Sequence, residues 1–167
     1  MKIYLAGFDV FRPDAITHGD NLREECRRNG FVGLYPMDKQ LPSALQRRAL
    51  AQWIYQANVG LIREADFVVA NLNPFRGSEP DSGTAFEVGY AVALGKSVWA
   101  YIDDDRTLVE RLSGNPAEKG KVHVDDGNFT IEDFDLPLNL MLGASSKIIK
   151  GDAAVCIRAL ARSVWGA

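Results

Sequence analysis

The sequence predicts an α/β fold in which helices cover both faces of a mostly parallel sheet. Strand and helix patterns alternate from the first residue, which is the order of elements that builds a parallel sheet. Residues 66–72 are an apolar run rich in β-branched side chains, typical of a strand buried on both faces. The chain has 167 residues, of which 47% are apolar, enough for one core. We therefore expect residues 1–167 to form a single domain, a three-layer flavodoxin-like or Rossmann-like sandwich.

The first half of the chain contains two predicted strand and helix pairs. Residues 2–6 form a short buried strand, and residues 18–29 form a charged helix. Residues 31–35 form the second strand. The helix over residues 43–65 is expected to begin with Ser43 as its cap, because apolar residues recur about every four positions after it.

In the second half, the strand over residues 66–72 is expected to lie in the middle of the sheet. A turn-rich loop then opens a helix over residues 83–94. Residues 103–135 are acidic, contain four glycine or proline interruptions and show no sustained periodicity, so they are predicted to form a long irregular excursion. The remaining predictions are a strand over 97–102, a short helix beginning within 138–142, a final helix from the Asp152 cap to Val164, and helix stops at Gly30 and Gly95.

Composition argues against several classes of function. Nineteen Lys and Arg against 22 Asp and Glu give a net charge of −3, which argues against a nucleic-acid polymer as partner. Apolar stretches are broken well short of the roughly 20 residues that cross a bilayer, so we expect no membrane association. The first residues lack the apolar region of a signal peptide, and we expect a cytoplasmic protein. Cys26 and Cys156 fall in predicted helices, which argues against a disulfide framework or thiolate metal site.

Several motifs that hold cofactors or metals are missing from the sequence. Ligands of parallel sheets bind beyond the carboxyl ends of the strands, yet the first such loop has Gly7 alone where a dinucleotide site needs a glycine-rich turn. There is no GxxxxGK[ST] or GxSxG motif, and His18 and His123 lie far apart in the sequence. We therefore expect no cofactor, no metal and no Ser-His triad.

The loop after the central strand carries an acidic pair. Asp81 and Glu87 lie six residues apart across the start of a helix, at the mouth of the sheet. Gly83 and Gly89 leave little side-chain bulk near Glu87, so a ligand can approach the backbone. These residues alone leave a second interpretation open, in which Asp81 or Ser82 caps the helix, Glu87 is solvated and Gly89 serves packing.

Five separated pieces of the sequence together resemble the nucleoside 2-deoxyribosyltransferases, which move 2-deoxyribose from one nucleobase to another. The pieces are Ile3-Tyr4-Leu5-Ala6-Gly7, Pro36-Met37-Asp38-Lys39-Gln40, Asn58, the stretch from Asp81 to Gly89, and Asn139-Leu140-Met141-Leu142. The resemblance therefore extends from Ile3 to about Leu142.

This resemblance implies a role for each matched residue. Glu87 is the expected nucleophile, Tyr4 orients it, and Asp81 is a ligand of the sugar hydroxyls. Gln40 is expected to contact the base, and Asn58 to lie near base and sugar. Some members carry Asp where this chain has Asn58, so no proton donor to the leaving base is assigned. Residues 103–135 form a longer segment than in the shortest members, which leaves the outer rim of the pocket unpredicted.

The last piece implies a homo-oligomer. This segment is expected to reach into the site of a neighbouring subunit, where Asn139 contacts the sugar and Met141 lines the pocket. The partners implied are 2′-deoxynucleosides and free nucleobases, as in nucleoside salvage. Near the nucleophile, Phe8, Phe11 and Phe75 are expected to wall the pocket with Met141 or, equally, to be ordinary core. Gly7 and Gly83 are expected among the substrate-binding residues.

The residue types suit that reaction. Breaking an N-glycosidic bond builds positive charge on the sugar, and a carboxylate below the anomeric carbon can stabilise this charge or bond to the carbon. A covalent intermediate on Glu87 would give ping-pong kinetics and net retention.

Alternatives remain at this stage. Related hydrolases of 2-deoxynucleoside 5′-monophosphates carry Ser in place of Asp81. A carboxylate at this position repels a 5′-phosphate and therefore favours an unphosphorylated substrate. Arg12, close to the first loop, keeps the hypothesis of a phosphorylated substrate open. Hydrolysis of nucleosides, a non-catalytic nucleotide-binding module and an oligomeric scaffold are the other hypotheses. Whether both purines and pyrimidines are used depends on pocket width.

Overall fold

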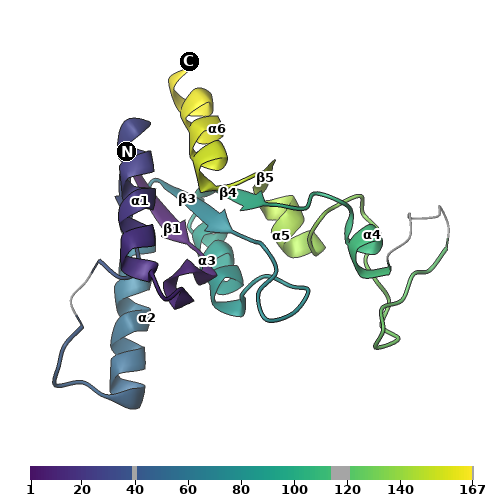
Figure 1. Cartoon of the computed structure of the whole chain (residues 1–167), viewed down its shortest axis with the longest axis horizontal. Helices are drawn as coiled ribbons and strands as arrows, with labels where there is room; N and C mark the ends of the chain where they lie inside the picture. The colour runs from purple at the N-terminus through teal and green to yellow at the C-terminus, as the bar shows by residue number, and fades with distance from the viewer. Residues whose placement is uncertain (39–40, 114–120, 167) are drawn as a thin grey trace.

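The computed structural model describes residues 1–38, 41–113 and 121–166. Its sheet has five strands in the order β2-β1-β3-β4-β5, and every neighbouring pair is parallel (Figure 1). The strands are β1 (Lys2–Ala6), β2 (Val32–Leu34), β3 (Phe67–Asn71), β4 (Ser97–Ile102) and β5 (Lys147–Lys150). The predicted α/β class is confirmed, and the strand expected in the middle of the sheet lies there.

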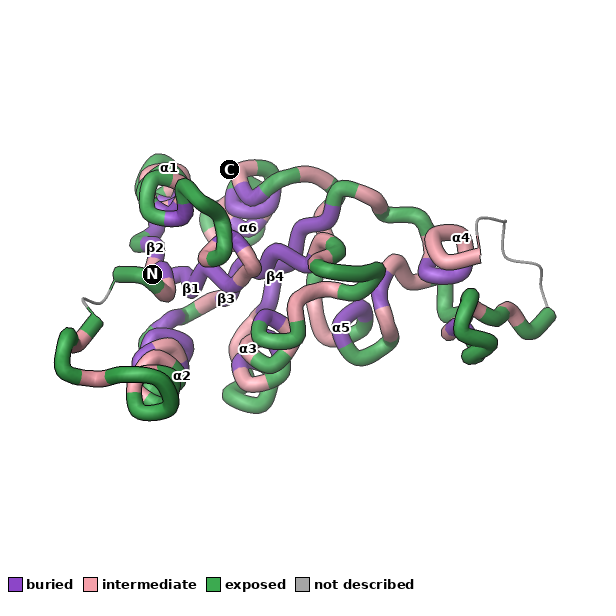
Figure 2. Tube along the Cα trace, turned by 60° about the horizontal axis from the view of Figure 1, so that its bottom comes forward, coloured by how far each residue is buried: buried purple, intermediate pink, exposed green. Residues whose placement is uncertain are grey.

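Helices cover both faces of the sheet and complete the three layers (Figure 2). One face carries α1 (Ala15–Arg28) and α6 (Ala153–Trp165), and the other carries α2 (Arg47–Glu64), α3 (Ser82–Ala93) and α5 (Leu140–Ser145). A short 3-10 helix, η1 (Phe8–Phe11), follows β1, and α4 (Leu108–Ser113) lies beyond the end of the sheet.

Alternation along the strands divides the core between the two faces. In β1, Ile3 and Leu5 pack with side chains of α1 and α6, whereas Tyr4 and Ala6 pack with side chains of α2 and α3. Because the side chains of a strand alternate, this register brings the Tyr4 phenol to the face that carries α3.

Most of the predicted helix ends are confirmed. The Asp152 side chain accepts a hydrogen bond from the Val155 N–H and caps α6 as expected. Gly30 and Gly95 follow α1 and α3 with φ angles of 82° and 72°, the left-handed conformation that ends a helix at least cost in glycine.

Two local predictions are wrong. Helix α2 begins at Arg47 rather than Ser43, because residues 42–45 form a separate turn in which the Leu45 N–H donates to the Pro42 carbonyl. Strand β5 has no strand pattern in the sequence: it is an edge strand with only two apolar residues between Lys147 and Lys150. Lysines are common on such edges because they discourage pairing with another chain.

The predicted excursion contains some regular structure. Within it lie α4 and an isolated antiparallel bridge between Val124 and Thr130, and Leu108, Val109 and Ile131 form a small core of their own. Its described part extends away from the sheet (Figure 1).

We predict that Ile62→Ala lowers the free energy of unfolding by about 2–5 kcal/mol, because Ile62 is fully buried between α2 and the sheet. Ile16→Ala is the matched control: Ile16 is 67% exposed, so its loss should change stability by less than about 0.5 kcal/mol. Urea denaturation followed by circular dichroism measures both. Equal stability of the two variants would contradict the burial of Ile62.

Candidate active site

A tyrosine and a glutamate meet near the carboxyl ends of the strands. The Tyr4 hydroxyl on β1 donates a 2.6 Å hydrogen bond to Glu87 Oε1 on α3, across 83 residues of sequence. Tyr4 is fully buried and therefore held firmly, and its hydrogen bond fixes the orientation of the Glu87 carboxylate. The structure thus brings Tyr4 and Glu87 into direct hydrogen-bond contact, as the predicted orienting role of Tyr4 requires.

Asp81 caps the helix that carries Glu87. Its Oδ2 accepts hydrogen bonds from the Thr84 N–H at 2.9 Å and from the Thr84 hydroxyl at 3.0 Å. The sequence leaves two roles open for Asp81, a helix cap and a ligand of the sugar. The structure shows the cap, and Asp81 also lines the same pocket as Glu87. Cap and pocket wall are therefore compatible roles for one side chain.

The pocket beside Glu87 has a volume of about 380 Å³ and mostly apolar walls. It lies between η1, the segment after β2, and helices α2 and α3. Its lining residues are Gly7, Val10, Phe11, Pro36, Met37, Leu41, Trp53, Ile54, Ala57, Asn58, Asp81, Gly83, Thr84 and Glu87. Apolar walls with a few convergent polar groups are typical of small-molecule sites.

Asn58 supplies a polar group in this apolar pocket. Its Oδ1 atom is buried and has no hydrogen-bond partner within the described parts of the chain. A buried amide oxygen without a partner is costly, so a ligand that donates a hydrogen bond there would satisfy it.

Burial sets the protonation behaviour of Glu87. Loss of solvent raises the pKa of its carboxyl from 4.5 to about 7; the Tyr4 hydrogen bond opposes this rise and the Asp81 charge adds to it. Near neutral pH, both the carboxylate and the carboxylic acid are therefore populated. Such a perturbed carboxyl in a cavity is a common mark of a functional site.

The structure brings together most, but not all, of the predicted site residues. Tyr4, Gly7, Phe11, Asn58, Asp81, Gly83 and Glu87 lie at or on this pocket. Asn139 and Met141 line a separate hollow between α3 and α5, together with Gly89 and Val92. Phe8 lines a different cavity, and Gln40 lies outside the described residues.

Several wall residues carry little functional signal in the sequence. Trp53, Ile54 and Ala57 belong to the apolar side of α2, and sequence periodicity does not separate a residue that packs from one that lines a cavity. Val10 and Thr84 lie next to predicted site residues, and proximity to the acidic pair is the signal that could have found Thr84.

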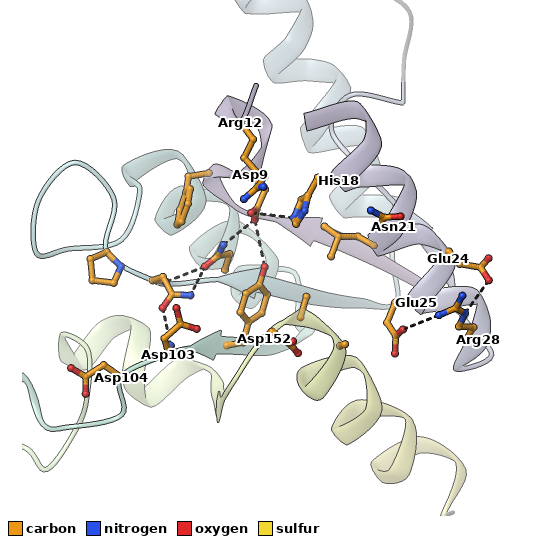
Figure 3. A pocket seen from close by; sticks show the side chains of 18 residues that line it. Asp9, Arg12, His18, Asn21, Glu24, Glu25, Arg28, Asp103, Asp104 and Asp152 are labelled. Carbon is orange, nitrogen blue, oxygen red and sulfur yellow. Dashed lines mark hydrogen bonds and ion pairs between the residues drawn. The ribbon is translucent and has the colours of Figure 1, made fainter. Parts of the chain in front are cut away.

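A second cavity, of about 810 Å³, lies on the other face of the sheet between α1 and the start of α6 (Figure 3). At its base the buried Asp9 carboxylate accepts from Asn71 Nδ2 at 3.0 Å and from the Tyr101 hydroxyl at 3.4 Å. His18 Nε2 lies 3.2 Å from Asp9 Oδ1. Arg12 lines this cavity, where it pairs with Asp14, and it is absent from the lining of the Glu87 pocket.

Two further features bear on function. Within the described ranges, no group of three or more His, Cys, Asp or Glu side chains is arranged to hold a metal ion. No helix in the described part of the chain has both the length and the apolar character required to span a membrane.

Fold and pocket together define a class: an α/β protein with a small-molecule site at the carboxyl edge of a parallel sheet, built around a partly buried carboxylate. The profile of the family described as nucleoside 2-deoxyribosyltransferase matches residues 3–141. The chain belongs to this family.

Similar proteins agree with that assignment. The structure of a 2-desoxiribosyltransferase from Leishmania mexicana is 36% identical with a TM-score of 0.72, covering 92% of this chain and 93% of that one. A 2-deoxyribosyltransferase from Bacillus psychrosaccharolyticus is 25% identical with a TM-score of 0.51, over 61% of this chain and 72% of its own. An uncharacterized Schizosaccharomyces pombe protein is 34% identical over 113 residues; the match spans 66% of this chain but about half, 54%, of that protein.

We predict opposite pKa shifts for Glu87 when its two polar neighbours are changed. Tyr4→Phe removes a hydrogen bond that favours the carboxylate, so the pKa of Glu87 should rise above about 7. Asp81→Asn removes a nearby negative charge, so the pKa should fall. Titration by ¹³C NMR with label at the glutamate side-chain carboxyls measures both shifts.

The control for this titration is Tyr55→Phe, which removes the hydroxyl of a tyrosine 44% exposed on α2. It should leave the Glu87 titration unchanged. A fall in the pKa of Glu87 in Tyr4→Phe would contradict donation from Tyr4 to the carboxylate.

Proposed function

We propose that this protein transfers 2-deoxyribose between nucleobases, with Glu87 as the nucleophile. The observation that carries the proposal is the 2.6 Å hydrogen bond from Tyr4 to Glu87 beside an apolar pocket that also contains Asp81. Membership in the nucleoside 2-deoxyribosyltransferase family supports the same chemistry. The activity provides exchange of bases among deoxynucleosides, a salvage reaction.

The reaction proceeds in two displacements at the anomeric carbon. A Glu87 oxygen bonds to this carbon while the C–N bond to the first base breaks, and that base leaves with the bonding electron pair and acquires a proton. A ring nitrogen of the second base then attacks the same carbon and loses its proton, and the ester bond breaks to restore the Glu87 carboxylate. The two inversions give net retention at the anomeric carbon. The kinetics are ping-pong because the first base leaves before the second base reacts with the covalent intermediate.

The surroundings of Glu87 suit this role. The raised pKa of about 7 indicates a carboxylate that is poorly solvated and therefore reactive toward a developing positive charge. Tyr4 holds the rotamer of Glu87 so that little ordering is required during the reaction. Apolar walls that include Trp53 and Phe11 can cover a nucleobase and limit the entry of water, which would otherwise capture the sugar.

An unphosphorylated nucleoside is the substrate that this pocket favours. Asp81 provides a negative charge beside Glu87, which disfavours a 5′-phosphate and can accept a hydrogen bond from a free hydroxyl. Arg12, which could have supported a phosphorylated substrate, lines the other cavity and is paired with Asp14.

A second copy of the chain is proposed to complete each site. Asn139 and Met141 are absent from the lining of their own chain's Glu87 pocket, and Met141 is 74% exposed. They line a hollow between α3 and α5 together with Val92, which is also exposed. Such exposed apolar residues on adjoining helices are suited to an interface between copies of the chain, through which Asn139 would reach a neighbour's sugar.

We predict that Glu87→Gln lowers transfer by at least about a thousandfold, because the amide keeps the shape of the side chain but is not a nucleophile. Transfer is measured as exchange between a 2′-deoxynucleoside and a second free base, analysed by liquid chromatography. Mass spectrometry of wild-type protein with donor alone should show a deoxyribosyl adduct on Glu87 that the variant lacks.

The matched control is Glu79→Gln, an exposed glutamate in the loop before α3, which should keep full activity. Sugar release at the same rate with and without an acceptor base would indicate a hydrolase. Undiminished transfer by Glu87→Gln would refute Glu87 as the nucleophile and favour a binding role.

We also predict that two inactive variants restore activity when mixed. Asn139→Ala and Glu87→Gln damage opposite contributions to a shared site, so a mixed assembly contains some sites with both residues intact. For a dimer with reciprocal sites, an equal mixture refolded together should recover roughly a quarter of wild-type activity. Recovery is measured by the same exchange assay.

Lack of recovery, with light scattering showing that the variants do assemble together, would contradict a shared site. A fully active monomer on dilution would contradict it as well. The mixture of Glu79→Gln with Glu87→Gln, in which activity should only be diluted, provides the baseline.

A further inference from the structure

Three aromatic rings and an arginine meet at the rim of the Glu87 pocket. The Phe75 ring stacks with Phe8, with centroids 4.8 Å apart, and with Phe11, with centroids 5.4 Å apart. The Arg76 guanidinium carbon lies 4.6 Å from the centroid of Phe75 and 5.3 Å from that of Phe11. We refer to Phe8, Phe11, Phe75 and Arg76 together as the rim stack.

Of these four residues, Phe11 is the one that lines the Glu87 pocket. Its side chain is 57% exposed, so core packing does not hold its ring in place. The ring contacts of Phe11 are with Phe75 and Arg76, which belong to the loop between β3 and α3. The position of this part of the pocket wall therefore depends on two loop residues that are themselves outside the pocket lining.

The turn that carries Phe11 is anchored on its other side. Asp9, in the same short helix η1, is buried and bound by Asn71 and Tyr101 at the ends of β3 and β4 (Figure 3). Gly7 leaves room for this anchor: a side-chain carbon at that position would lie 2.6 Å from Asp9 Oδ2. These hydrogen bonds to Asp9 hold η1 against the ends of β3 and β4.

The backbone of the loop is also adapted to the contact. Arg76 has a φ angle of 54°, a left-handed conformation that is unfavourable for residues other than glycine. Such strain persists where the surroundings determine the conformation, and it concentrates at functional sites. The Phe75 N–H donates to the Glu79 carbonyl at 2.9 Å, which closes the loop behind the two side chains.

We propose that Phe75 and Arg76 are positioning residues that hold the Phe11 ring as a stacking surface for the nucleobase. The inference rests on the proposed function, since it assumes a base in this pocket. Phe75 stacks with Phe11 and Arg76 adds a cation–π contact, so the ring is presented to the pocket without being ordered at each binding event. The two residues act on affinity for the base rather than on the bond-breaking step.

Base binding without turnover tests the proposal directly. In a Glu87→Gln background, calorimetry with free adenine and free cytosine should show at least about fivefold weaker binding after Phe75→Leu, because the Phe11 ring is then no longer held in place to stack on the base. Phe75→Tyr keeps an aromatic ring and should bind within about twofold of the parent. In the active protein, Phe75→Leu should raise KM for the acceptor base and change kcat less than twofold.

Arg76→Gln provides a second test that does not depend on the folding of Phe75→Leu, because the Arg76 side chain is exposed. It should weaken base binding about twofold to fivefold. Phe129→Leu, at a 73% exposed phenylalanine in the excursion, is the matched control and should leave binding unchanged.

The outcomes separate the two levels of inference. Unchanged base affinity in both Phe75→Leu and Arg76→Gln would overturn the positioning role even if transfer itself is established. A fivefold fall in kcat of Phe75→Leu, with no change in its KM for the acceptor base, would also overturn the positioning role. Absence of any base binding to the Glu87→Gln parent would instead count against the proposed function.

Discussion

The hydrogen bond between Tyr4 and Glu87 is the contact on which the candidate site depends, since it joins the first strand to the helix that follows the central strand. It requires that β1 lie beside β3, so that α3 passes over the carboxyl end of β1. It also requires the strand register that turns Tyr4 toward α3. The parallel topology, the alternation along β1 and the start of α3 therefore together set the distance between the Tyr4 hydroxyl and Glu87 Oε1. Burial of the same carboxylate raises its pKa to about 7, so the structural contact and the electrostatic character of the site have a common origin.

Structure and function share residues at the start of α3. Asp81 satisfies a backbone N–H that would otherwise lack a partner, and it directs a negative charge toward the pocket. Capping fixes the position of the carboxylate relative to Glu87, because both belong to the same rigid helix. The stabilising role therefore supports the proposed functional one: a cap that is well ordered is also a well-placed ligand for a sugar hydroxyl.

Two groups of polar residues lie near the carboxyl ends of the strands, one on each face of the sheet. On the α3 side, the Glu87 pocket is mostly apolar, and the Asn58 amide oxygen in it has no partner among residues 1–38, 41–113 and 121–166, as expected where a ligand supplies one. On the α1 and α6 side, Asp9 has partners on β3, β4 and α1. The short helix η1 lies between these environments, and the rim stack connects it to the loop that leads to Asp81. The contacts of Asp9 and the rim stack therefore hold η1 from two sides.

The sequence by itself determined the strands β1 and β4, the central place of β3, the Asp152 cap and the acidic pair at the start of α3, because each depends on local pattern or on residues near in sequence. Local pattern misplaced the start of α2 and missed β5, where turn geometry and edge pairing outweigh propensity. Resemblance to a family supplied Tyr4 and Asn58, which come near Glu87 only in the folded chain. Only the tertiary structure decided that Phe8 and Phe11 face different cavities, that Asn139 lies away from its own chain's pocket, and that Glu87 titrates near neutrality. Each of these depends on distances between segments far apart in sequence and on the water that their packing excludes, neither of which a local pattern of residues contains.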